Sequence, residues 1–279
     1  MKSKFLAILI AVLSLASCRS LVLENRINCP RFLFFDLENG TDFHSYDNIY
    51  VTVYNHPEGR LLNSANTTVG EVLNKEFYFE IKGEKAVKGY GILGNKNQEL
   101  QNDSEWIIPI GMDSDPLFRF SYISETQEES FFVPVEFVKD YSHVVVRFVG
   151  METFDSAEGQ FPFEVFITSN TCGIEALSGK PIRGRFEYSP EEINYGKFEM
   201  NLPRQADRSL RLTLSGKPGV YDAPDYMVPF DLWAMLFDQW GVTWEEKNLP
   251  DIEVLIDYQE MKVEVSVTEW GEENLNYEF

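Results

Sequence analysis

Short runs in which apolar and polar residues alternate recur along most of this chain. Successive side chains of a strand point to opposite faces of a sheet, so such a run covers a core with one face and meets water with the other. Clusters of Asn, Gly, Pro and Asp separate the runs, as they do at the turns between strands. The first series of runs lies at residues 49–53, 77–81, 106–108, 118–120 and 143–149. This spacing predicts an all-β protein built as a sandwich.

A second series of runs follows a break at residues 150–159, which are rich in acidic and small residues. It comprises residues 163–167, 184–188, 197–202, 210–214, 251–256 and 262–270. A hydrophobic fraction of 44% in 279 residues is enough for two cores of ordinary size. We therefore expect two tandem β-sandwich domains, at residues 29–152 and 160–279.

One stretch, residues 229–237, has apolar residues at helical spacing, and Asp231 is available to cap it. It predicts a short helix in the second domain, packed on a sheet. Its aromatic and methionine stripe could line a ligand pocket, but such stripes usually face the core.

The N-terminus reads as a secretion signal. Lys2 and Lys4 precede a largely apolar run at residues 5–16, which is too short to span a bilayer. Leu15-Ala16-Ser17-Cys18 matches a lipobox, in which cleavage before the cysteine leaves a thiol and an α-amine for acylation. We expect residues 1–17 to be a lipoprotein signal peptide, Cys18 to be lipidated, and residues 18–28 to form a tether. The alternative is an ordinary signal peptide with a chance cysteine.

The mature chain is strongly acidic. Without Lys2 and Lys4 its formal charge is 22 minus 45, or −23. Phosphate backbones and anionic headgroups repel such a surface, which argues against nucleic-acid partners and against electrostatic docking on a membrane. Attachment to the envelope would therefore depend on the lipid.

Two further cysteines, Cys29 and Cys172, leave an even count in an exported protein, which permits a disulfide. A bridge would close a loop of over a hundred residues and contribute about 4 to 5 kcal/mol in the chain-entropy treatment. The alternative is two isolated buried thiols, because sequence does not show how far apart the two residues lie.

Signals for an enzyme are weak. Gly89, Gly91 and Gly94 match the glycine fingerprint of dinucleotide sites, and Asp113 falls near the distance of its acidic partner. That site needs a helix directly after the glycines, yet residues 95–102 have no apolar face to pack one. The glycines are better read as the end of a strand, and we expect no cofactor.

Metal binding and nucleophilic catalysis are likewise unsupported. The histidines, His44, His56 and His143, have no ligand spacing, and neither Cys29 nor Cys172 lies in a close Cys/His pair. No nucleophile elbow, metalloprotease helix or phosphate-binding loop occurs. We expect a protein that is not an enzyme and holds no metal.

The order of several segments resembles the FimB/Mfa2 family. They are the lipobox, Cys29-Pro30, Thr171-Cys172-Gly173-Ile174, Gly179-Lys180-Pro181-Ile182-Arg183-Gly184, Leu202-Pro203-Arg204-Gln205, Trp244, Ile252-Glu253-Val254 and Val265-Ser266-Val267-Thr268-Glu269-Trp270. The family comprises fimbrillin-like lipoproteins of Bacteroidales. The resemblance implies two transthyretin-like β-sandwich domains in an outer-membrane lipoprotein that holds a fimbria, limits its length and has fimbrial structural subunits as partners.

Assembly of such a polymer suits strand complementation, in which a strand from another subunit pairs with an exposed sheet edge. The C-terminal segment, residues 262–270, is our candidate for this element; alternatively it is an ordinary internal strand.

Two features bear on location and modification. Residues 19–23 after Cys18 lack the acidic cluster that marks export to the outside in some Bacteroidetes lipoproteins, so outer-membrane attachment is better supported than cell-surface exposure. Asp155-Ser156-Ala157 resembles the O-glycosylation pattern of that phylum and makes Ser156 a candidate acceptor, although so short a pattern also arises by chance.

A competing function is glycan capture by a surface lipoprotein of β-sandwich fold. Exposed aromatic faces can stack on sugars while carboxylates bind hydroxyls, and Trp106, Trp240 and Trp244 are the candidates. Against this reading, aromatic residues in sandwiches usually belong to the core.

Overall fold

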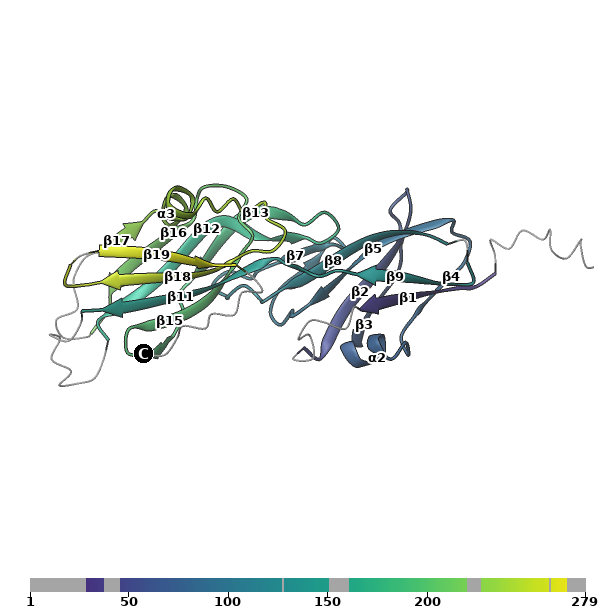
Figure 1. Cartoon of the computed structure of the whole chain (residues 1–279), viewed down its shortest axis with the longest axis horizontal. Helices are drawn as coiled ribbons and strands as arrows, with labels where there is room; N and C mark the ends of the chain where they lie inside the picture. Colours follow the sequence, from purple (N-terminus) through teal and green to yellow (C-terminus); the bar gives the residue numbers. More distant parts are fainter. Residues whose placement is uncertain are drawn as a thin grey trace, which may run out of the picture.

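The structure is a computed structural model and describes residues 29–37, 46–126, 128–150, 161–219, 227–260 and 262–269. These residues form an all-β fold with two short helices. Figure 1 shows the strands gathered into two lobes that lie end to end along the long axis of the molecule. The prediction of an all-β fold is confirmed. The transthyretin-like topology implied by the resemblance stays a prediction.

The first lobe has two sheets packed face to face. One has the order β4-β1-β9 and the other the order β10-β8-β5-β2-β3. Their bounds are β1 Arg31–Leu37, β2 Asn48–Asn55, β3 Leu61–Thr68, β4 Phe79–Ile81, β5 Ala86–Leu93, β8 Phe118–Glu125, β9 Ser130–Val135 and β10 Val138–Lys139.

The core of the first lobe follows from alternation along β1. Leu33 and Phe35 point inward, and the Phe35 ring makes edge contacts with Phe120 and Tyr122 of the facing sheet. β1 runs antiparallel to β4 but parallel to β9, so a strand at the start of the lobe lies beside one near its end.

A helix that the sequence reading missed, α2 (Val69–Leu73), covers part of this lobe. Its start is a capping box, because Thr68 Oγ1 accepts from Glu71 N at 3.1 Å while the Glu71 carboxylate accepts from Thr68 N at 3.0 Å. These bonds also hold the pKa of Glu71 below its usual value.

The second lobe also has two sheets, with the orders β14-β15-β11-β18-β19 and β17-β16-β12-β7-β6, and β13 pairs with β12 as well. Their bounds are β6 Glu99–Gln101, β7 Glu105–Ile107, β11 Tyr141–Val149, β12 Phe163–Glu175, β13 Lys180–Tyr188, β14 Glu192–Asn194, β15 Lys197–Pro203, β16 Arg211–Gly216, β17 Met227–Phe230, β18 Asp251–Asp257 and β19 Lys262–Thr268. Val144, Val146, Ile167, Leu212 and Val254 are among its buried core residues.

The helix expected in the second lobe is present as α3 (Leu232–Trp240). Asp231 caps it as expected by accepting from Ala234 N at 2.9 Å. Gly241, with φ +67°, ends it in the left-handed conformation that glycine adopts without strain.

Strand pairing differs from the expected division of the chain in one respect. β11 lies within the range expected for the first domain, yet it pairs with β15 and, in parallel, with β18 of the second lobe. β7 also pairs with β12 across the division. The sheets of the second lobe therefore include strands from residues 99–149. The domain limits themselves stay a prediction.

A small cluster of buried residues fills the joint between the lobes. Tyr54, Tyr90 and Trp106 from the first half of the chain pack with Ile174 and Ala176 from the second. The hydroxyl groups of Tyr54 and Tyr90 both donate to the Asp103 carbonyl, at 2.5 and 2.7 Å. Both lobes thus contribute to one packed joint.

Candidate interaction site

The C-terminal strand β19 ends its sheet among the described strands, as an edge strand beside β18. Trp240 Nε1 of α3 donates to the Val265 carbonyl at 2.7 Å, so this carbonyl points away from β18. Backbone groups alternate along an antiparallel strand, so those of Val263 and Val267 point toward the open edge too. β19 thus offers backbone groups for a further strand.

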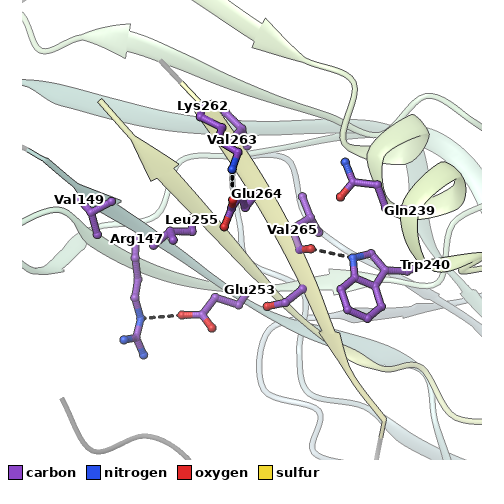
Figure 2. Close-up of a pocket in the computed structure, with 11 residues that line it drawn as sticks. Arg147, Val149, Gln239, Trp240, Glu253, Leu255, Lys262, Val263, Glu264 and Val265 are labelled. Carbon is purple, nitrogen blue, oxygen red and sulfur yellow. Dashed lines mark hydrogen bonds and ion pairs between the residues drawn. The ribbon is translucent and has the colours of Figure 1, made fainter. Parts of the chain in front are cut away.

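A groove of about 840 Å³ lies beside this edge. Figure 2 shows it between the outer faces of β11, β18 and β19 on one side and the C-terminal end of α3, with Gln239 and Trp240, on the other. The lining residues are Arg147, Val149, Gln239, Trp240, Glu253, Leu255, Lys262, Val263, Glu264, Val265 and Ser266.

The charges in the groove are paired within the chain. Arg147 Nε lies 3.0 Å from Glu253 Oε1 across the parallel strands, and Lys262 pairs with Glu264 along β19. The bond to Glu264 holds the pKa of Lys262 above its usual value. The groove therefore combines apolar surface, a half-exposed indole ring and neutralised charge, a composition suited to a peptide strand or a sugar.

The predicted tryptophans have different environments. Trp106 and Trp244 are each only 4% exposed and belong to buried clusters, so neither is available to a glycan. Trp240 is 51% exposed and lines the groove. Of the three glycan candidates, only Trp240 can meet a ligand.

The predicted disulfide between Cys29 and Cys172 is wrong, because both thiols are free. Cys29 is exposed just before β1, at the start of the first lobe. Cys172 lies on β12 in the second lobe, where its carbonyl accepts from Ile108 N and its sulfur faces Gly184. Burial raises the pKa of the Cys172 thiol. The two cysteines thus lie in different lobes, and only Cys172 is part of a strand.

Cys18 and Ser156 lie outside the residues that the structure describes, so their modification stays a prediction. His44 also lies outside them. Nowhere in the described ranges do three or more His, Cys, Asp or Glu side chains gather in an arrangement that could hold a metal ion. Those ranges contain no helix that is long and apolar enough to cross a membrane.

The glycine motif is part of a strand. Gly89 and Gly91 lie in β5, where an added Cβ would come within 2.1 Å of the Thr52 carbonyl oxygen or the Phe120 ring. Gly94, with φ +87°, turns the chain at the strand end. β6 follows, not a helix, so these glycines serve close packing.

Asp113, the apparent acidic partner of that motif, instead accepts from Asn201 N of β15 at 2.9 Å. Desolvation raises its pKa to about 6. It therefore links the segment before β8 to the second lobe.

A set of partly buried and exposed aromatic rings was not predicted from the sequence. Phe32, Phe34, Tyr78 and Phe132 lie on the outer face of the β4-β1-β9 sheet, and we call them the aromatic patch. Alternation in Phe32-Leu33-Phe34-Phe35 was the available signal, because it places Phe32 and Phe34 together on the face opposite Leu33 and Phe35.

The fold is shared with solved structures of low sequence identity. A candidate polysaccharide-binding protein from Bacteroides thetaiotaomicron matches with a TM-score of 0.61 and 14% identity over 87% of this chain and 96% of that one. The fimbrial anchor protein Mfa2 from Porphyromonas gingivalis matches with a TM-score of 0.58 and 11% identity over 87% and 98%. A candidate adhesin from Bacteroides thetaiotaomicron matches with a TM-score of 0.58 and 15% identity over 86% and 96%.

These likenesses show the fold, which this chain shares with a fimbrial anchor protein, a candidate adhesin and a candidate polysaccharide-binding protein. The resemblance expected from the sequence is confirmed at this level, because Mfa2 shares the fold over nearly its whole length. No protein-family model and no curated protein matches the sequence.

Proposed function

We propose that this protein is an outer-membrane lipoprotein that anchors fimbriae to the cell envelope and limits their length. The observation that carries the proposal is the combination of a lipobox cysteine, Cys18, with a body that has the fold of the anchor protein Mfa2. The step from fold to role is an analogy, since one fold can host several functions. An acylated N-terminus would be committed to lipid, so a polymer that ends on this chain stops growing at the membrane.

Electron microscopy of a Cys18→Ala strain tests the anchoring role. We expect long filaments shed into the medium, because the subunit that holds them no longer carries its acyl chains. A strain with Cys29→Ala is the matched control, since Cys29 is a free thiol outside the lipobox. Filaments of normal length that stay attached in the Cys18→Ala strain would contradict the proposal.

The open edge of β19 is the surface that we assign to a fimbrial subunit. A strand added there would bond to the outward backbone groups of Val263, Val265 and Val267, while its side chains enter the groove. Trp240 occupies the Val265 carbonyl, so its indole would have to release this bond as the strand docks.

Substitutions at Val267 separate this role from a structural one. Val267→Pro removes an outward N–H group and leaves the ladder to β18 in place, whereas Val267→Ala shortens the side chain and keeps the donor. We expect only the proline variant to lose co-purification with sheared fimbriae while remaining membrane-bound. Equal retention of fimbriae by both variants would exclude this edge. Deleting β19 is less informative, because Val265 belongs to the core.

Glycan capture is a second candidate, favoured by the half-exposed Trp240 in the groove and by the candidate polysaccharide-binding neighbour. A glycan array probed with wild type, Trp240→Ala and Phe237→Ala tests it. Phe237 is 42% exposed on the same helix but does not line the groove, so it is the control. Binding lost only with Trp240→Ala would support capture, and absence of binding by wild type would reject it.

A further inference from the structure

The aromatic patch is unusual for the outer face of a sheet, which is normally polar. Its four rings form one contiguous row: Phe32 meets Tyr78 at 5.3 Å, Tyr78 meets Phe34 at 5.6 Å, and Phe34 stacks on Phe132 at 5.2 Å. Tyr78 is 48% exposed and Phe132 is 55% exposed, and none of the four belongs to the core of the first lobe.

The lysines beside the patch are paired with carboxylates. Lys75 pairs with Asp36 and lies over the Phe132 ring, 5.7 Å from its centre, and Lys82 pairs with Glu80. The chain as a whole carries a formal charge of −21. The patch is thus an aromatic area, bordered by ion pairs, on an acidic protein, and its uncharged rings would be repelled by anionic headgroups less than the acidic surface is.

The patch also lies where the chain enters the first lobe. Phe32 and Phe34 are on β1, directly after Cys29, the first described residue. Cys18 and Cys29 are eleven positions apart, which is at most about 40 Å of chain. An acyl group on Cys18 would keep the patch within that distance of the bilayer. The effective concentration of lipid at the patch would then be high, so that even a weak contact between the patch and the bilayer would be populated.

We propose that the aromatic patch is a membrane-contact surface that inserts into the interface of a lipid bilayer and orients the first lobe on it. Tyrosine is favoured at the headgroup level, where its ring leaves water while the hydroxyl stays hydrated, and phenylalanine rings bury their apolar surface at the boundary with the acyl chains. This proposal rests on the lipid attachment proposed above for its high local concentration, but the contact itself is a property of the four rings.

Vesicle co-sedimentation of the mature chain carrying Cys18→Ala tests the contact without any acyl chain. We expect Phe34→Ser/Phe132→Ser to bind phosphatidylcholine vesicles about tenfold more weakly than its parent, since two rings no longer leave water. Ile110→Ser/Met227→Ser is the matched control, because these side chains are 74% and 66% exposed away from the patch, and its binding should equal that of the parent. Adding phosphatidylglycerol to the vesicles should not strengthen binding.

A Phe132→Trp variant provides a second readout that does not depend on the stability of the serine variants. This variant fluoresces more than the parent chain because of the extra indole, and vesicles with brominated acyl chains should quench that additional fluorescence. Equal binding by the patch and control variants, or an unquenched Trp at position 132, would overturn the proposal. Protection of the patch by fimbrial subunits but not by vesicles would overturn it as well. If the aromatic patch does not bind vesicles, the proposed lipid anchoring through Cys18 is unaffected. Lipid anchoring is tested separately, because without it the wild-type protein would take up no acyl label.

Discussion

Arg119 donates through Nε to Asp140 Oδ2 at 2.7 Å, in a buried ion pair at the joint between the lobes. The other oxygen of Asp140 accepts from Arg204 Nε at 3.0 Å, and Arg204 also donates to carbonyls of the loop that follows α3. One carboxylate thus links β8 of the first lobe to β15 and to that loop in the second. Each charge is hydrogen-bonded, which is the condition under which buried charges are tolerated.

Asp140→Ala should strongly destabilise the protein. It leaves two buried guanidinium groups without their counter-charge, a change that costs about 3 to 5 kcal/mol of unfolding free energy. Urea denaturation measures the effect. Glu187→Ala, which breaks the exposed pair with Arg185, is the control and should cost no more than about 1 kcal/mol. Equal losses for the two variants would show that the buried cluster does not hold the joint.

Gly89→Ala should destabilise the first lobe through overpacking. The added Cβ would lie 2.1 Å from the Thr52 carbonyl oxygen and 2.6 Å from the Tyr122 hydroxyl, so β2 and β5 must shift, at about 2 to 3 kcal/mol. In Gly70→Ala the nearest atom to the new Cβ is 3.9 Å away, within α2, and stability should stay equal or rise by up to about 1 kcal/mol. Thermal unfolding followed by circular dichroism compares the two, and an unaffected Gly89→Ala would refute the packing role.

Asp113 should make stability fall as pH rises toward neutrality. Its pKa is about 6 in the folded protein against an ordinary value of 3.8, so between these two values the folded state binds more protons than the unfolded state. Stability from this group is therefore present at low pH and is lost as pH rises through about 6. Asp113→Asn keeps an oxygen for Asn201 N and removes the titration. Unfolding free energy is measured against pH for the wild type and for Asp113→Asn, and the difference between the two curves isolates the effect of Asp113. Parallel curves would contradict the prediction.

The two free cysteines should react at different rates. Cys29 is exposed, whereas Cys172 is half-buried and its thiol has a raised pKa, so a smaller fraction is the reactive thiolate. Intact mass after timed alkylation without reductant, on the Cys18→Ala chain, should show one rapid and one slow addition. If the chain takes up no label until it is reduced, the two cysteines are joined by a disulfide and this prediction is wrong.

Local signals in the sequence predicted local structure well. Asp231 and the apolar spacing behind it located α3, and period-two runs located strands such as β2, β11 and β18. The capping residues Thr68 and Glu71 also carried a signal for α2, which is only five residues long and has little periodicity to support it.

Long-range pairing could not be predicted in this way. The run at residues 143–149 shows which side chains share a face but not that Val144 lies beside Ile252, more than a hundred residues later. The same limit explains the tryptophans, since local sequence does not show that tertiary packing covers Trp106 and leaves Trp240 half-exposed. Arg119, Asp140 and Arg204 also have no common spacing, so their cluster had no signature to find.

The parallel pairing of β1 with β9 has a mechanical consequence. β1 begins two residues after Cys29, the first described residue, on the side of the proposed lipid tether, and β9 leads through β10 to β11 in the second lobe. If the envelope holds the start of β1 while a filament pulls on the second lobe, the two strands are drawn in opposite directions along their length. This is a shear geometry, in which all the hydrogen bonds between the two strands resist the force together instead of breaking one after another. The paired stretch runs from Phe32 opposite Ser130 to Leu37 opposite Val135. Under the proposed anchoring role, the protein would therefore resist tension best along the direction of β1 and β9.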